Sequence, residues 1–205
     1  EEACQIVVRA DSEISTVEEL EGHRVSIGEE ESGTKQNALQ ILAAYGLNEK
    51  LVEEVSLNYT EAAKELENGT IDAFFCTAGV QTAAITNLAQ RTGIRFLNVD
   101  SAAAARLKKS YPVYDSCIIA AGTYPGQEED VSTVGVKAVL LASDSVSAEV
   151  VEELTALLFE EQQELDFALP VELITEADAA ADGLPVPFHK GAERYYESRG
   201  EKSEN

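Results

Sequence analysis

The sequence is poor in basic residues, and this shortage excludes two classes of binding partner. Only 15 Lys and Arg residues stand against 38 Asp and Glu residues, which gives a formal net charge of −23 at pH 7. Nucleic acids and anionic membrane surfaces are bound by basic faces, so we expect neither as a partner. The acidity is that of a well-solvated surface and identifies no function by itself.

Cysteine and histidine are also scarce, and their positions argue against disulfide and metal sites. The three cysteines, Cys4, Cys76 and Cys117, are far apart, and each lies in an apolar run. We therefore expect buried thiols rather than a disulfide framework or a zinc cluster. The two histidines, His23 and His189, have no metal-ligand spacing, so no metal site is predicted.

The sequence also lacks long hydrophobic runs, since no stretch approaches the ~20 apolar residues that a membrane-spanning helix needs. It contains no secretory signal pattern, and because it begins with Glu1 rather than Met we expect a trimmed N-terminus. Hydrophobic residues make up 44% of the chain, which indicates a folded core rather than disorder. A length of 205 residues fits one large domain or two small lobes.

Short β-rich runs alternate with amphipathic segments up to about residue 110, which predicts an α/β fold with a largely parallel sheet. Ser15 and Glu18 have the spacing of a capping box at the start of a short helix. The strands expected in this part are Cys4–Arg9, Arg24–Ile27, Val55–Leu57, Ile71–Cys76 and Arg95–Val99. The longer helices expected between them begin near residues 34, 60, 80 and 101.

The pattern changes after Pro112. Two further strands are predicted at Ser116–Ala120 and Lys137–Ala142. Two helices follow, at Ser147–Leu165 and Ala192–Ser198. This change indicates that the C-terminal part is organised differently from the alternating part.

The glycine-containing loop from Gly28 to Lys35 is not a nucleotide-binding P-loop. That motif ends in Gly-Lys-Ser/Thr, whereas Gly33-Thr34-Lys35 exchanges the last two residue types. The lysine must reach the β/γ-phosphates and the hydroxyl must reach Mg²⁺, so the order matters. Three consecutive glutamates in the same loop would also repel a triphosphate.

Two turns of similar composition follow predicted strands and are candidates for a ligand site. Ser32, Gly33 and Thr34 place hydroxyls and backbone N–H groups at a helix N-terminus, which suits a carboxylate. Thr77, Ala78 and Gly79 follow the next buried strand in the same way. Two such turns at one edge of a parallel sheet would form a ligand crevice. The alternative for each is an ordinary helix cap.

Three tyrosines flank the change in pattern, and two other residues are candidate nucleophiles. Tyr111, Tyr114 and Tyr124 would either line a ligand pocket or pack at a junction between lobes. Cys76 or Ser32 would need a nearby base to act as a nucleophile, and no nucleophile motif surrounds either of them. We therefore predict that the chain is not an enzyme and needs no cofactor.

Four stretches of the sequence form a set. They are Ser15–Gly28 (STVEELEGHRVSIG) with Ser32-Gly33-Thr34 after it, Ile71–Gly79 (IDAFFCTAG), Ala121–Gln127 (AGTYPGQ) and Gly183–Tyr196 (GLPVPFHKGAERYY). Together they resemble the type II periplasmic solute-binding proteins. More narrowly, they resemble the TAXI family, the substrate-capturing subunits of TRAP transporters. The resemblance extends from about Gln5 to Gly200.

The resemblance implies a two-lobe periplasmic-binding-protein-like fold of type II in which lobe I is incomplete. Residues 1–12 would form a crossover strand, residues 13–130 lobe II ending in a hinge segment, and residues 131–205 the return to lobe I. Members of the family carry about a hundred residues before this point. We therefore expect the chain to lack the N-terminal third of such a protein.

The resemblance also implies a function. A small carboxylate or amino acid would be held between the lobes by Ser32, Gly33, Thr34 and the Thr77–Gly79 turn, with the three tyrosines covering its apolar body. The loaded receptor would be extracytoplasmic and would dock on a TRAP permease in the membrane. Because three glutamates adjoin the site, a glutamate- or glutamine-like ligand fits better than a bare dicarboxylate. The alternative is the effector-sensing domain of a regulator that uses the same fold.

Overall fold

The computed structural model describes residues 1–160 and 186–199. The chain divides into two compact units: unit 1 is Glu1–Lys137, and unit 2 is Ala138–Asn205. The predicted motif at Gly183–Tyr196 lies partly outside the described residues, as do the last residues of the predicted helix Ser147–Leu165.

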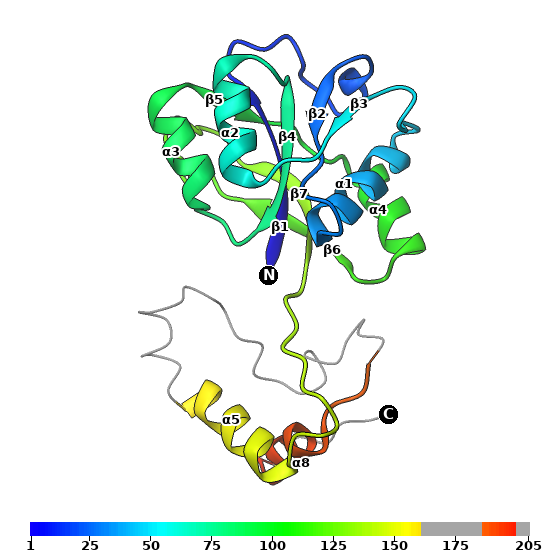
Figure 1. The fold of residues 1–205 in the computed structure, drawn as a ribbon, viewed down its shortest axis with the longest axis vertical. Coiled ribbons are helices and arrows are strands. Elements are labelled where there is room, and N and C mark those ends of the chain that lie inside the picture. The colour runs from blue at the N-terminus through cyan, green and yellow to red at the C-terminus, as the bar shows by residue number, and fades with distance from the viewer. Residues whose placement is uncertain (161–185, 200–205) are drawn as a thin grey trace. The chain divides into compact units, whose positions relative to one another are not determined.

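Unit 1 is built on one seven-stranded mixed sheet (Figure 1). The strand order is β3-β2-β4-β1-β7-β6, and β5 pairs with β1 beside this path. The strands are β1 (Glu2–Arg9), β2 (Arg24–Ser26), β3 (Glu53–Val55), β4 (Ala73–Ala78), β5 (Ile94–Phe96), β6 (Tyr114–Ile119) and β7 (Val131–Val136). The predicted α/β class is therefore confirmed.

The prediction of a largely parallel sheet is wrong. β2 is parallel to both β3 and β4, but β1 is antiparallel to β4, β5 and β7. β6 and β7 are also antiparallel, because the turn between them returns the chain directly as a hairpin. Hydrophobic periodicity marks a strand without giving its direction, so the pattern could not show that β1 runs against its neighbours.

Helices cover both faces of this sheet (Figure 1). α1 (Gly33–Ala44) and α4 (Ser101–Ser110) pack on one face, and α2 (Tyr59–Asn68) and α3 (Ala83–Arg91) pack on the other. Successive residues of a strand point to opposite faces. Phe75 accordingly joins the core under α1 and α4, and Phe74 joins the core under α2 and α3. β4, buried on both faces, therefore reads as a continuous apolar run.

One local prediction fails near the start of unit 1. The segment after Ser15 is a short 3₁₀ helix, η1 (Glu18–Leu20), without a side-chain cap. The Glu19 carboxylate, rather than Glu18, accepts the N–H groups of Ser15 and Thr16 at 2.6 and 3.2 Å. This reversed contact satisfies the backbone at the start of the turn without the predicted capping box.

The predicted strand Lys137–Ala142 is likewise absent, and the less apolar β7 takes the place beside β6. The side chains of Leu140 and Leu141 are each 71% exposed. The division between the units falls after β7, whereas the boundary predicted at residues 130/131 falls before it. The assignment of the two parts to lobes stays a prediction.

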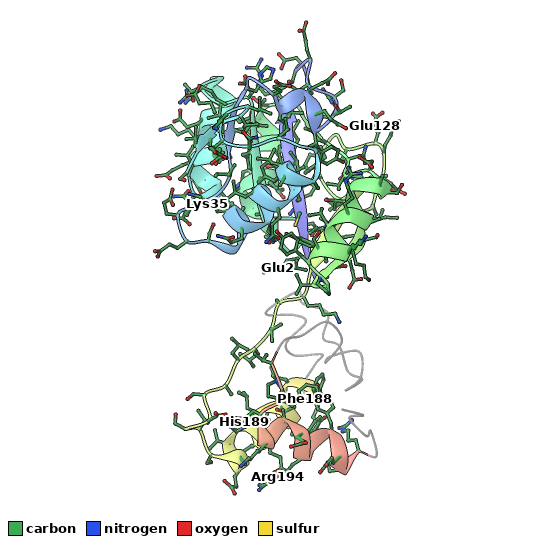
Figure 2. All side chains as sticks on the ribbon, turned by 90° about the vertical axis from the view of Figure 1, so that its right-hand side faces the viewer. Glu2, Lys35, Glu128, Phe188, His189 and Arg194 are labelled. Carbon is green, nitrogen blue, oxygen red and sulfur yellow. The ribbon has the colours of Figure 1, made fainter. Side chains whose placement is uncertain are left out.

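In the described part of unit 2, two helices pack closely together. α5 (Ala148–Glu160) contacts α8 (Lys190–Ser198), whose N-cap is His189. Gly191 makes this approach possible, because an added Cβ would lie 2.7 Å from the backbone nitrogen of Glu152. Aromatic rings fill the space around the pair, including Phe188, which Figure 2 labels next to His189.

Candidate functional site

The candidate site is the edge of the sheet at which β2 and β4 end. These two strands are adjacent and parallel, with Val25 in register with Ala73, so the segments that follow them lie at the same edge. We call residues 28–34 the α1 turn and residues 77–82 the α3 turn. The sequence-based expectation that these two turns lie together is met by the strand pairing.

The α1 turn depends on a glycine and carries a strained residue. Gly28 has φ +95°, and a Cβ there would lie 2.9 Å from both Cβ and Cγ2 of Thr34. Glu31 has φ +62°, a left-handed conformation that is unusual for a residue with a side chain. Ser32 is the N-cap of α1, which is the alternative that the sequence left open beside a ligand-binding role: the Lys35 N–H donates to its Oγ at 3.1 Å, and its hydroxyl donates to the Glu29 carbonyl at 2.7 Å.

The α3 turn has the same sequence of features. Gln81 has φ +62° and directly precedes the N-cap Thr82, as Glu31 precedes Ser32. The Thr82 hydroxyl donates to the Gly79 carbonyl at 2.8 Å, and unlike Ser32 it accepts no N–H from the first turn of its helix, α3. Uncapped N–H groups leave the positive end of the helix dipole available to an acceptor. The two left-handed residues were not foreseen from the sequence, because neither is glycine or asparagine.

Tyr59, on α2, links the two turns and was also missed. Its hydroxyl lies 2.6 Å from Thr34 Oγ1 and donates to the Thr77 carbonyl at 2.9 Å. Burial raises the pKa of the Tyr59 hydroxyl, so the group keeps its proton. A signal for its position exists in the sequence: Asn58 and Glu61 form a capping box, which fixes Tyr59 at the first position of α2.

Two of the predicted tyrosines reach this edge from within the core. Tyr114 is buried in the core under α1 and α4, and its hydroxyl contacts Asn37 Oδ1 and Gln40 Oε1 at 3.1 and 2.6 Å. Asn37 in turn donates to the Thr77 hydroxyl at 3.3 Å. This ring is covered by protein, which differs from the predicted place over a ligand.

Tyr124 occupies the equivalent place in the core under α2 and α3. Its hydroxyl donates to Gln5 Oε1 at 2.5 Å and accepts the Thr82 N–H at 3.2 Å. It therefore holds the α3 turn against β1. Tyr111 is 42% exposed and contacts Tyr114 edge-on at 6.3 Å between ring centroids.

The acidic residues of the α1 turn are partly neutralised. Lys35, labelled in Figure 2, places its Nζ 2.7 Å from both oxygens of Glu30, and Ser56 donates to the same carboxylate. The Lys35 contact holds the pKa of Glu30 below its usual range. Glu29 and Glu31 remain exposed to solvent. Lys35 therefore serves the loop itself and is not a free phosphate-binding lysine.

The geometry gives no support to the catalytic alternatives. Burial raises the pKa of the Cys76 thiol to about 12 and that of Cys4 to about 11, so neither is a thiolate near neutral pH. Within unit 1, His23 pairs with Asp72 at 3.2 Å, and within unit 2, His189 caps α8. Among residues 1–160 and 186–199, no cluster of side chains is arranged to hold a metal ion. No helix in the same residues is long and apolar enough to cross a membrane.

A shallow cavity of about 380 Å³ lies at the opposite edge of the sheet. Arg9, Asp11, Glu67 and Thr92 are among its lining residues, and they come from the end of β1 and the C-terminal ends of α2 and α3. Its charged groups are paired with each other or with neighbours, as in Arg9–Asp11 and Glu67–Arg91. It is separate from the two turns and was not part of the prediction.

Replacing Ser26 or Ser32, which lie on either side of the loop between β2 and α1, by alanine should change the free energy of unfolding in opposite directions. Ser26, the last residue of β2, is fully buried, and its hydroxyl has no partner among the described residues. Ser26→Ala should raise the free energy of unfolding by about 1 kcal/mol, because a buried unpaired hydroxyl is costly. Ser32→Ala should lower it by about 1 kcal/mol through the lost N-cap. Urea denaturation of both variants measures this difference, and a loss of stability in Ser26→Ala would contradict it.

Comparison with known proteins finds one family match and several similar solved structures. The sequence model of a family described as NMT1-like matches residues 1–200. The mixed α/β fold matches solved structures of periplasmic binding proteins. One is the aliphatic sulphonate binding protein SsuA of Escherichia coli, at 17% identity and a TM-score of 0.48, covering 96% of this chain and 61% of that chain.

Two other matches have similar descriptions. A putative periplasmic sulfonate-binding protein SsuA from Methylobacillus flagellatus KT is 19% identical with a TM-score of 0.41, covering 47% of this chain and 27% of that chain. An ancestral arginine-binding protein bound to glutamine is 17% identical with a TM-score of 0.44, covering 82% and 57%. The chain thus spans 27–61% of the length of these three structures.

Proposed function

The chain belongs to the NMT1-like family, and from this premise we propose that it is an extracytoplasmic solute-binding receptor for a small carboxylate or amino acid. One observation carries the proposal: the α1 and α3 turns present two helix N-termini at the same edge of the sheet. Helix N-termini attract anions through their unpaired N–H groups and their dipoles. Neither a catalytic base nor a metal centre is needed for this role.

The surroundings of the α1 turn favour a ligand that also carries a positive charge. Glu29 and Glu31 are exposed beside the turn, and Glu30 is already paired with Lys35. A bare dicarboxylate would be repelled by the two free carboxylates, whereas the ammonium group of an amino acid would be attracted. We therefore propose a glutamate- or glutamine-like ligand, held by its α-carboxylate. Sulfonates belong in the test as well, because they are oxyanions and two of the matched proteins are described as binding them.

The route of delivery is proposed from the resemblance stated above. A TAXI-type receptor delivers its solute to a TRAP permease, which uses an ion gradient. The expected result is therefore that cells carrying the receptor and its permease accumulate the solute only while the gradient is maintained. Uptake that survives collapse of the gradient would contradict the TRAP assignment and leave the binding proposal intact. Binding without any uptake would favour the regulator alternative.

Ligand binding should be visible as thermal stabilisation. At a ligand concentration 100 times Kd, linkage predicts about 2.7 kcal/mol of added stability. For a chain of this length that corresponds to a rise in Tm of about 5–10 °C. The panel is glutamate, glutamine, arginine, succinate, 2-oxoglutarate and ethanesulfonate. The controls are analogues in which amides replace the α-carboxylate, both carboxylates of the non-amino acids, or the sulfonate, and which therefore lack the oxyanion. No stabilisation by any acid, confirmed by calorimetry, would contradict the proposal.

A further inference from the structure

The hydrogen bonds around Tyr59 have only one possible direction. The Thr77 carbonyl can only accept, so the single Tyr59 hydroxyl proton goes to it at 2.9 Å. The Tyr59 oxygen is then left to accept, and the Thr34 hydroxyl donates to it at 2.6 Å. Thr34 is 5% exposed, so this contact is shielded from water. These two hydrogen bonds, from Thr34 to Tyr59 and from Tyr59 to Thr77, join the first turn of α1 to the end of β4.

These bonds leave main-chain groups as the available donors of the α1 turn. The Ser32 hydroxyl donates to Glu29, the Thr34 hydroxyl to Tyr59, and the Lys35 ammonium to Glu30. Among the described residues, the N–H groups of Gly33 and Thr34 have no hydrogen-bond partner. An anion at this turn would therefore be bound by backbone N–H groups, whose positions depend on what holds the helix start in place.

We propose that Tyr59 is a positioning residue of the binding site. Its hydroxyl fixes the α1 turn against β4 and so sets where the N–H groups of Gly33 and Thr34 meet the ligand's oxyanion. The left-handed Glu31, at φ +62°, shows that local backbone preference does not hold this turn by itself. The two hydrogen bonds of the Tyr59 hydroxyl supply the constraint that holds this turn against β4. This inference rests on the proposed function for its meaning in ligand binding.

The test compares two Tyr→Phe variants of the whole chain. Tyr59→Phe keeps the ring and removes both hydrogen bonds. Tyr45→Phe is the matched control, because Tyr45 follows the other end of α1, and its hydroxyl accepts the Asp100 N–H at 2.8 Å. Both variants should lose a similar, modest amount of stability in urea. The Kd for the best acid of the panel should rise about 10-fold in Tyr59→Phe and remain within twofold of the wild type in Tyr45→Phe.

A second measurement keeps this inference separate from the proposed function. In ligand-free protein, ¹⁵N relaxation of the Gly33 and Thr34 amides should show increased motion in Tyr59→Phe and none in Tyr45→Phe. If the wild type binds an acid and Tyr59→Phe binds it equally well, the positioning role of Tyr59 is overturned, whereas the proposed solute-binding function is supported. Equal weakening by both variants would also overturn it, because it would indicate a general structural effect. If no acid binds, the proposed function fails. Unchanged amide motion in Tyr59→Phe would separately show that the Tyr59 hydroxyl does not hold the α1 turn in place.

Discussion

Gly28→Ala is expected to lower the free energy of unfolding of unit 1 by about 2–4 kcal/mol, a combined effect of backbone strain and overpacking. Gly28 has φ +95°, where a side chain is strained. The added Cβ would also meet Thr34 at 2.9 Å. Thr34 cannot turn away without losing its 2.6 Å hydrogen bond to Tyr59. Thermal denaturation should therefore show a fall in Tm of about 5–15 °C.

Gly46→Ala separates the two causes. Gly46 has φ +75°, but a Cβ there would have nothing within 4 Å. Its replacement should cost about 1 kcal/mol, from backbone strain alone. The difference between the two variants then measures the contact between residue 28 and Thr34. Equal losses of stability in the two variants would mean that the α1 turn relaxes freely around the added Cβ. The inference that the turn is held in a fixed position would then be wrong.

The sequence predicted much of the α1 turn but not the Tyr59 hydrogen bonds that hold it in place. An N-cap at Ser32 was one of the two alternatives open for this turn, because its residue type and its place before a helical pattern are local features. The pairing of the two turns followed from the order of strands and helices. Tyr59 was missed because its contacts join α2 to α1 and β4, and no local pattern encodes such a tertiary contact. Only the capping box at Asn58 would have placed Tyr59 near the correct edge.

The errors in the fold have a similar origin. Residues 138–142 are more apolar than β7, yet β7 forms the strand because it pairs with both β6 and β1. Thr133 shows why polarity misled the prediction, since it is buried and its hydroxyl donates to the Cys4 carbonyl. A polar side chain satisfied inside the sheet looks, in sequence, like one in a loop. Strand partners and directions are tertiary properties, and hydrophobic periodicity reports neither of them.

Gly191→Ala is expected to separate α8 from α5. The added Cβ would lie 2.7 Å from the backbone nitrogen of Glu152 and 2.8 Å from the Cβ of Val151. Backbone atoms cannot rotate away as side chains do, so the cost should reach the upper end of the range for overpacking, about 3 kcal/mol. Helices as short as α8 are marginal without tertiary contacts. Amide hydrogen exchange in α8 should therefore accelerate about 100-fold, while unit 1 amides serve as the internal reference.

Gly33→Ala is the matched control for this prediction. Gly33 also lies in the first turn of a helix, but a Cβ there would have nothing within 4 Å. Alanine is the better helix former, so this variant should keep or slightly raise the protection of α1. If Gly191→Ala leaves the protection of α8 amides from exchange as high as Gly33→Ala leaves that of α1 amides, the packing of α5 on α8 does not depend on the close approach at Gly191. The aromatic contacts of Phe159 with Tyr195 and Tyr196 would then be the main link between α5 and α8.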